Sequence, residues 1–212
     1  MIFVGRKKEK GKIIDALQHG KNIIVTGKFG IGRTSLMQEV AKEMNKRRQF
    51  LFVDFSQTPG KMSDTLMKEM GISRRFHKSG TKMGYKSMCH RIAKYASPAK
   101  NKTVIVFDNI ARLTPQRNIF LRRIIEESHF QFIAICENFL PAKEFMRLRA
   151  QLIPMETIAL NHLPTEDVSE FIRQYTIKLQ LDWSDAYIDD VTALAGGYPL
   201  GIIDLIKSVM NK

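Results

Sequence analysis

The feature that most constrains this sequence is an apolar run, a glycine-rich segment and an amphipathic stretch in direct succession. Asn22–Thr26 is apolar enough to form a buried strand. Gly27–Thr34 contains three glycines, and an apolar spacing that suits a helix begins at Thr34. Strand, glycine loop and helix in this order predict a phosphate-binding loop, in which backbone N–H groups and the helix N-terminus face an anion. An ordinary tight turn is the alternative.

One residue departs from the phosphate-loop pattern G-x-x-x-x-G-K-[ST]. The pattern has Lys where this chain has Arg33, so a planar guanidinium replaces a compact ammonium. Thr34 keeps the hydroxyl that would ligate Mg²⁺, whereas Lys28 lies at the wrong place to substitute for the missing Lys. We therefore expect nucleotide binding with altered phosphate contacts. The candidate nucleotide-binding residues of the loop are Gly27, Lys28, Phe29, Gly30, Ile31, Gly32, Arg33, Thr34 and Ser35.

Composition limits the class of protein. With 212 residues, 44% of them hydrophobic, the chain suits one α/β domain with a small helical appendage. Its two cysteines have no metal-like spacing, and no apolar run approaches the ~18 residues that span a membrane. The N-terminus does not resemble a signal peptide, so we expect a cytoplasmic protein without a membrane partner. The net charge of +13 favours an anionic partner, nucleic acid before membrane.

Strands and helices alternate along the first three quarters of the chain. Beyond the first strand, the pattern predicts strands at 50–55, 103–108, 130–136 and 155–160. It predicts helices at 7–18, 34–44, 62–70, 87–95 and 115–127, and a loop over 71–86. Three helices, at 165–179, 184–195 and 199–210, follow without further strands. The sequence thus predicts an α/β core over residues 1–160, with a five-stranded parallel sheet flanked by helices, and a helical lid over 161–212.

The third predicted strand ends in a candidate metal ligand. Asp108 follows an apolar run, so its carboxylate would emerge at the edge of the sheet beside the phosphate loop and hold Mg²⁺ through water. The alternative is that Asp108 merely ends a strand. Asn109 stands where many nucleotide-hydrolysing proteins with such a loop place a glutamate. The amide of Asn109 can orient a water molecule but cannot accept its proton. We therefore expect slow hydrolysis or another base.

Five motifs in order give the chain a resemblance to the AAA+ ATPases, a superfamily of P-loop NTPases, and most closely to their STAND and archaeal-ATPase branch. The motifs are Phe3–Arg6, Gly32–Leu36, Val106–Asn109, Phe132–Asn138 and Gly196–Leu200. The resemblance spans residues 3 to about 207 and implies ATP and Mg²⁺ as ligands and assembly into a homo-oligomer.

The resemblance also implies roles for further residues. Gly5 and Arg6 would lie near the adenine, and Asn138 would contact the γ-phosphate or the attacking water. Pro199 belongs to the lid motif, but Leu200 follows it where other AAA+ clades have a phosphate-sensing arginine.

Two arginines stand where AAA+ rings carry an arginine that completes the nucleotide site of the neighbouring subunit. These are Arg147 and Arg149, for which a solvated basic helix is the alternative, and Arg122 and Arg123 are weaker candidates.

The positive charge is concentrated between Lys61 and Lys102. This segment has eleven Lys and Arg against two acids, a net charge of +9 out of +13. Such a block indicates contacts with the backbone phosphates of nucleic acid. The segment has no set of side chains that would read bases. The alternative is that the charge only keeps the protein soluble. The candidate nucleic-acid-binding residues are Arg74, Arg75, Lys78, Lys82 and Lys86.

The sequence therefore favours an ATP-binding AAA+-type switch that hydrolyses ATP slowly and engages nucleic acid, duplex DNA before RNA, without sequence preference, as a transposition, replication or defence accessory. A motor-like ATPase with ordinary turnover is one alternative. A non-hydrolysing adaptor, stabilised by nucleotide and bound to a protein partner, is the other.

Overall fold

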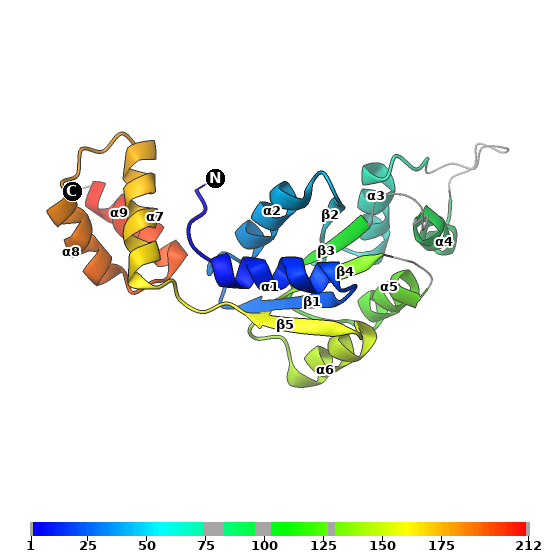
Figure 1. Ribbon diagram of the computed structural model, residues 1–212. Coiled ribbons are helices and arrows are strands. Elements are labelled where there is room, and N and C mark those ends of the chain that lie inside the picture. The colour runs from blue at the N-terminus through cyan, green and yellow to red at the C-terminus, as the bar shows by residue number, and fades with distance from the viewer. Residues whose placement is uncertain (1, 74–82, 96–102, 127–129, 211–212) are drawn as a thin grey trace.

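A five-stranded sheet forms the centre of the molecule. The computed structural model describes residues 2–73, 83–95, 103–126 and 130–210 (Figure 1). The strands are β1 Asn22–Gly27, β2 Gln49–Asp54, β3 Thr103–Ile110, β4 Gln131–Glu137 and β5 Met155–Ala159. Their order in the sheet is β2-β3-β4-β1-β5, and every neighbouring pair is parallel. This confirms the predicted P-loop NTPase fold.

The central strands are buried on both faces, which explains their continuous apolar sequences. Ile23, Ile24 and Val25 of β1 have no exposed surface, and β4 is buried from Phe132 to Glu137. Alternate residues of each strand contribute to two separate cores, because successive side chains point to opposite faces of a sheet.

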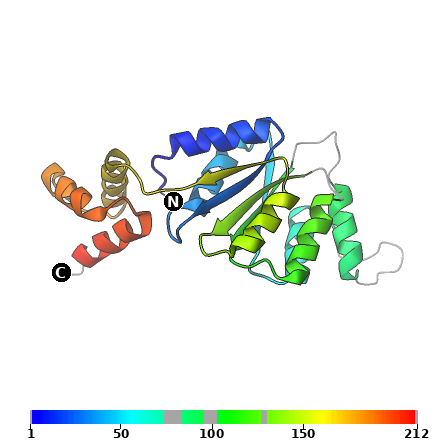
Figure 2. The same cartoon turned by 90° about the horizontal axis from the view of Figure 1, so that it is seen from below.

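Helices cover both faces of the sheet (Figures 1 and 2). The core on one face contains residues of α1 (Lys7–Gln18) and α2 (Arg33–Met44). The core on the other face contains residues of α3 (Pro59–Glu69), α4 (Tyr85–Tyr95), α5 (Pro115–Glu126) and α6 (Ala142–Gln151). Within the ranges that the structure describes, no helix has the length and apolar content needed to cross a membrane.

Three of the predicted elements differ from their predicted bounds by two residues or more, for local reasons. Helix α3 begins at Pro59, three residues earlier than expected, because the Thr58 side chain accepts a hydrogen bond from the Lys61 N–H and proline suits the first helical position. Strand β3 continues past Asp108 to Ile110 through an irregular register with β4. Helix α4 begins at Tyr85, within the last part of the predicted loop, most of which lies outside the described residues.

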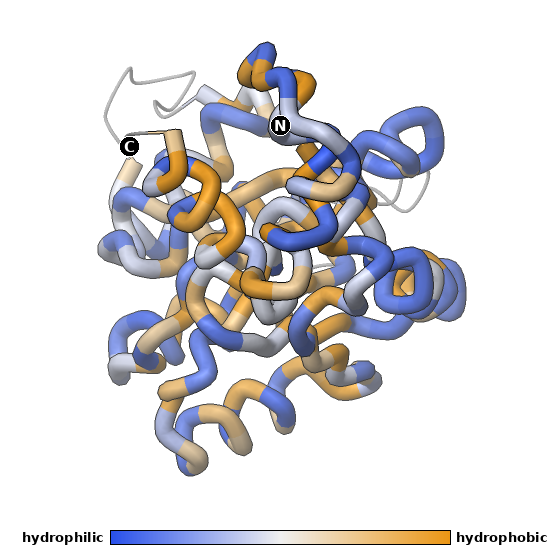
Figure 3. Tube along the Cα trace, turned by 90° about the vertical axis from the view of Figure 1, so that its left-hand side faces the viewer, coloured by the Kyte–Doolittle hydropathy of each residue, from blue (hydrophilic) through white to orange (hydrophobic). Residues whose placement is uncertain are grey.

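Three helices after β5 form a lid with its own core (Figure 2). They are α7 (Thr165–Lys178), α8 (Asp185–Ala195) and α9 (Pro199–Met210). Much of α9 is hydrophobic (Figure 3), and its buried Ile202 and Ile206 belong to this core. The N-terminal Ile2 and Val4 pack against the same core, so the first residues of the chain contact the lid. The division between core and lid at residue 160 stays a prediction.

Candidate nucleotide-binding site

The loop between β1 and α2 depends on glycine at particular positions. Gly30 and Gly32 have φ values of 77° and 94°, in the left-handed region that other residues rarely adopt. A Cβ atom on Gly30 would lie 2.7 Å from the Cβ of Leu200 in the lid. A Cβ on Gly27 would lie 2.8 Å from Cγ2 of Ile31 and 3.1 Å from the Leu160 carbonyl oxygen. Both the curl of the loop and its close packing therefore require these glycines.

Several carbonyl groups of the loop already accept hydrogen bonds. The acceptors are the carbonyls of Lys28, Phe29, Ile31 and Gly32, and their donors are the Ile31 N–H, the Tyr198 hydroxyl, the Arg6 guanidinium and the Leu36 N–H, respectively. Because these acceptors are engaged, the loop and the first turn of α2 offer a ligand mainly N–H donors. This is the arrangement that binds an anion.

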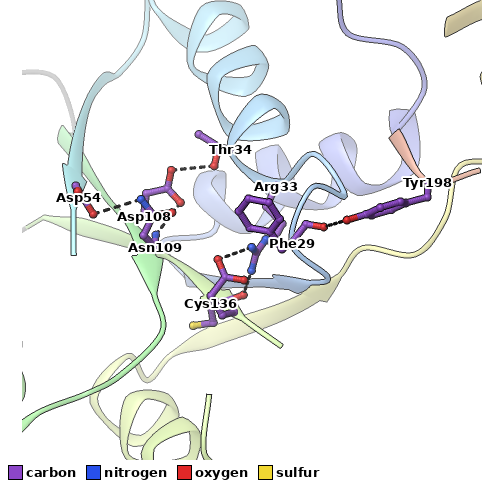
Figure 4. Close-up of polar contacts among 9 residues, drawn as sticks. Phe29, Arg33, Thr34, Asp54, Asp108, Asn109, Cys136 and Tyr198 are labelled. Carbon is purple, nitrogen blue, oxygen red and sulfur yellow. Dashed lines mark hydrogen bonds and ion pairs between the residues drawn. The ribbon is translucent and has the colours of Figure 1, made fainter. Parts of the chain in front are cut away.

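Arg33, the first residue of α2, is held away from solvent by the end of β4 (Figure 4). Its guanidinium donates to the carbonyl of Cys136 and, at 2.6 Å, to Oε1 of Glu137. Only 6% of Arg33 and 8% of Glu137 is exposed, so the ion pair is buried. The structure thus places the residue expected to hold phosphate in a salt bridge with a carboxylate that the sequence analysis had not selected.

The surroundings of this ion pair are tightly packed. Oε2 of Glu137 is buried and has no hydrogen-bond partner among the residues that the structure describes. Burial raises the pKa of the neighbouring Cys136 thiol to about 12, with the nearby Glu137 adding to the rise and Arg33 opposing it. The thiol is therefore uncharged at neutral pH, and Arg33 and Glu137 are the charged partners of this cluster.

Thr34 and Asp108 come together as predicted. The Thr34 hydroxyl donates to Oδ2 of Asp108 at 2.8 Å, and the Asn109 N–H donates to Oδ1 of Asp108 at 2.8 Å. A hydroxyl and a carboxylate are oxygen donors of the kind that Mg²⁺ prefers, with water and phosphate completing its octahedral shell. Among the described residues, no group of three or more acidic, His or Cys side chains could hold a metal by itself. The pair therefore fits Mg²⁺ bound together with a nucleotide.

Asn109 contacts an acid that the sequence analysis missed. Asn109 is exposed and has a φ of 61°, and its side-chain amide donates to Oδ1 of Asp54 at 3.3 Å (Figure 4). Asp54 ends β2 and pairs in register with Asp108 on β3. The sequence contains a pattern that could have identified Asp54, since it follows an apolar strand just as Asp108 does.

Asn138 lines a cavity beside the loop. This residue follows β4, is exposed, and lines a cavity of about 800 Å³ together with Thr26, Lys28 and Glu137. The structure therefore brings Asn138 to the same edge of the sheet as the phosphate loop.

A smaller pocket of about 280 Å³ lies between the core and the lid. Its lining comes from the N-terminal segment, the loop, α2, α7 and α9, and includes Phe3, Arg6, Gly30, Gly32, Ser35, Pro199 and Leu200. Arg6 donates to the Asn161 carbonyl at 2.5 Å and to the Ile31 carbonyl at 3.4 Å, so it joins the loop to the connection between core and lid. Gly5 lies against Asp167 of α7, where a Cβ atom would be 2.1 Å from the carboxylate oxygen. The mostly apolar lining suits a nucleotide base.

Three of the remaining candidates are exposed on helices of the core. Arg147 and Arg149 are exposed on α6, and neither forms an ion pair with any residue that the structure describes. Lys86 is exposed on α4. The other four nucleic-acid candidates, Arg74, Arg75, Lys78 and Lys82, lie outside the described residues.

A family model of the AAA domain matches residues 15–143, which is more than half of the chain. The chain therefore belongs to this family, and with its fold it is an AAA+ P-loop NTPase. No curated protein matches its sequence significantly. The narrower assignment to the STAND branch stays a prediction.

Solved structures share the fold at low sequence identity. The Orc1 protein of Aeropyrum pernix, in complex with DNA, has 14% identity and a TM-score of 0.64 over 84% of this chain and 50% of its own. The RuvB Holliday junction branch migration motor of Thermotoga maritima has 18% identity and a TM-score of 0.65 over 99% and 63%. Cdc6p of Pyrobaculum aerophilum has 8% identity and a TM-score of 0.66 over 94% and 61%. The chain thus spans 50% to 63% of the length of these proteins.

The buried ion pair yields a prediction about stability. Changing Arg33→Met or Glu137→Gln alone should destabilise the fold by about 3–5 kcal/mol, because each change leaves a buried charge without its partner. The double variant should cost less than the sum of the two, since neither charge is then left alone. Urea unfolding of the four proteins measures this coupling.

The matched control is an ion pair at the surface of the same helix. Glu39 accepts from Lys42 at 3.1 Å with the Lys42 side chain 66% exposed, so Glu39→Gln should cost less than about 1 kcal/mol. Additive costs for Arg33→Met and Glu137→Gln would show that the two side chains do not depend on each other.

Proposed function

We propose that this protein is an ATP-binding AAA+ switch that holds ATP with Mg²⁺, hydrolyses it slowly and engages nucleic acid without sequence preference. The observation that carries the proposal is the hydrogen bond from Thr34 to Asp108 beside a glycine loop that presents N–H donors. The loop and the first turn of α2 would hold the phosphates, and Thr34 and Asp108 would hold the metal. The pocket between core and lid would hold the base.

Two features support slow hydrolysis. Asn109 cannot accept a proton from the attacking water, and Arg33 is engaged by Glu137, so ATP would compete with a carboxylate for its guanidinium. A bound Mg²⁺ would neutralise charge on the phosphates. The chain's own contribution would be to position ATP, and this suits a switch whose bound state lasts.

Assembly is the next part of the proposal. AAA+ relatives such as RuvB are described as motors, and an exposed arginine on α6 could complete the site of a neighbouring copy. We propose that ATP promotes a homo-oligomer in which Arg147 or Arg149 has this role.

The nucleic-acid part rests on charge and on the neighbours. The Orc1 structure contains DNA, and RuvB is a branch migration motor that acts on Holliday junctions, although both share only the fold with this chain. The block of positive charge between Lys61 and Lys102 would contact backbone phosphates.

The first prediction from this proposal concerns the turnover of ATP. The protein should bind Mg·ATP in calorimetry at millimolar ATP, and its steady-state turnover should stay below about one per second, the lower edge of ordinary enzyme rates. Asp108→Asn should weaken binding in the presence of Mg²⁺ and leave binding in EDTA nearly unchanged, because only the metal contact is lost. Faster turnover would favour the motor alternative, and absence of binding would exclude the proposal.

The second prediction concerns assembly. Sedimentation should show a shift from monomer to oligomer when a non-hydrolysable ATP analogue is added. Changing Arg147 and Arg149 together to Ala should abolish the shift and leave nucleotide binding by the monomer unchanged. The control variant, with Lys7 and Lys8 of α1 changed to Ala, removes the same charge from another exposed site and should still assemble. A native protein that stays monomeric with analogue and DNA would contradict the role of these arginines.

The third prediction concerns DNA. Anisotropy on unrelated duplexes should give similar affinities, and five phosphate contacts per protomer should give a slope of about −4 to −5 in log affinity against log salt. Changing Arg74, Arg75 and Lys78 together to Ala should reduce both the affinity and the slope.

The control for this experiment removes three charges elsewhere. Lys7, Lys8 and Lys12 are exposed on α1, and changing them to Ala alters the net charge by the same amount. Equal effects of the two triple variants would show that only net charge matters. Affinity without salt dependence would favour the adaptor with a protein partner.

A further inference from the structure

The edge of the sheet carries a second carboxylate next to the candidate metal ligand. Asp54 is the last residue of β2, and it lies opposite Asp108 in the parallel pairing of β2 with β3. Because parallel strands end at the same edge, both residues lie at the edge of the sheet where β1 leads into the phosphate loop. Figure 4 shows Thr34, Asp108, Asn109 and Asp54 linked by hydrogen bonds across this edge.

The two carboxylates have different partners. Asp108 accepts from the Thr34 hydroxyl and from the Asn109 N–H, one at each oxygen. Asp54 accepts from the Ser56 N–H at 3.0 Å and from the Asn109 amide at 3.3 Å, both at Oδ1. Asp108 is thus engaged where a metal would lie, while Asp54 is joined to the residue that would orient a water.

Asn109 is held so that its two functional groups have separate roles. Its backbone is in the left-handed region, and its amide nitrogen donates to Asp54 at the end of β2. The side-chain carbonyl can then accept from a water, and the adjacent Asp54 carboxylate can accept the proton that the amide cannot.

We propose that Asp54 is the proton acceptor for ATP hydrolysis in this protein, with Asn109 positioning the attacking water. The inference rests on the proposed function, since it requires that ATP be hydrolysed. The water oxygen forms a bond to the γ-phosphorus, and the bond from that phosphorus to the bridging oxygen breaks with its electron pair remaining on ADP. The water's proton passes to the Asp54 carboxylate and from there to solvent.

The electrostatics of Asp54 agree with slow chemistry. Burial raises the pKa of Asp54. Hydrogen bonds from Ser56, Asn109 and Gln57 together lower it by more than burial raises it, so the pKa lies below the usual value for an aspartate. The carboxylate is therefore ionised at neutral pH, and it is a weak base. General-base efficiency falls as the pKa of the base falls below the working pH.

The rival role for Asp54 is structural, because it could simply fix the conformation of Asn109. The two roles differ in what Asp54→Asn does, since an amide keeps the shape and can still accept a hydrogen bond at its oxygen, but cannot take a proton.

The test measures single-turnover hydrolysis and Mg·ATP affinity for the native protein and Asp54→Asn. The rate should fall by about 10²-fold or more, while the dissociation constant should change by less than about threefold. Protein re-isolated after incubation with ATP should carry ATP in the variant, where the native protein carries ADP. Asp15→Asn, which removes an exposed carboxylate from α1, is the control and should match the native protein in all three measurements.

A second variant moves the carboxylate to the neighbouring strand. Asp54→Asn combined with Asn109→Asp places the acid at position 109, whose left-handed backbone aspartate tolerates. It should recover at least about tenfold of the rate lost in Asp54→Asn, because a base again lies beside the water.

Three results would overturn the inference about Asp54 while leaving the ATP-binding proposal in place. They are a rate for Asp54→Asn within about threefold of native, no recovery in the double variant, or native protein that binds ATP without hydrolysing it. If Asp54→Asn loses Mg·ATP affinity as much as rate, Asp54 acts in binding and the inference is equally wrong. Failure of the native protein to bind ATP would instead overturn the proposed function itself.

Discussion

The parallel direction of all five strands is the constraint on which the rest of the structure depends. Parallel strands end at one edge of the sheet, so residues far apart in sequence meet there. β1 leads into the glycine loop, while β2, β3 and β4 bring Asp54, Asp108 and Glu137 to the same edge. The register that aligns them is fixed by strands whose side chains are buried on both faces, because a slip of one residue would exchange the two cores. The candidate site is thus a consequence of how the hydrophobic cores are divided.

The ion pair between Arg33 and Glu137 changes what the loop can do. It ties the first residue of α2 to the end of β4, immediately before Asn138, so the glycine loop and β4 are joined by a buried charge pair. In the usual motif a lysine supplies a positive charge to the phosphates, whereas here a carboxylate already partly neutralises the charge at this position. The pair fixes the start of α2 against β4 and weakens the attraction of Arg33 for an anion. Substitution by arginine is explained by this contact, since its planar fork reaches the Cys136 carbonyl and the carboxylate together.

The sequence predicted the fold and the Thr34–Asp108 pair because both follow from local patterns. Apolar runs mark the strands, and the glycine loop and strand-ending aspartate are recognised within a few residues. The partners of Arg33 and Asn109 could not be predicted in the same way. Glu137 lies 104 positions from Arg33 and Asp54 lies 55 from Asn109, and only the strand order brings them together. The Thr58–Pro59 pair marks the early start of α3, whereas the apolar spacing that predicts a helix begins only later, at Met62.

The lid and the N-terminal segment reach the phosphate loop from two directions, and this arrangement suits a switch. The Tyr198 hydroxyl donates to the Phe29 carbonyl (Figure 4). Arg6 donates to the Ile31 carbonyl and to the Asn161 carbonyl at the start of the lid. Both contacts are made to the backbone of the loop, so they depend on its conformation and not on its side chains. A ligand that alters the turn at Gly30 would disturb the contact with Leu200 as well, where no space remains for even a Cβ atom. A change in the backbone of the loop would therefore reach α9 through the side chains of Tyr198 and Leu200, which contact it directly.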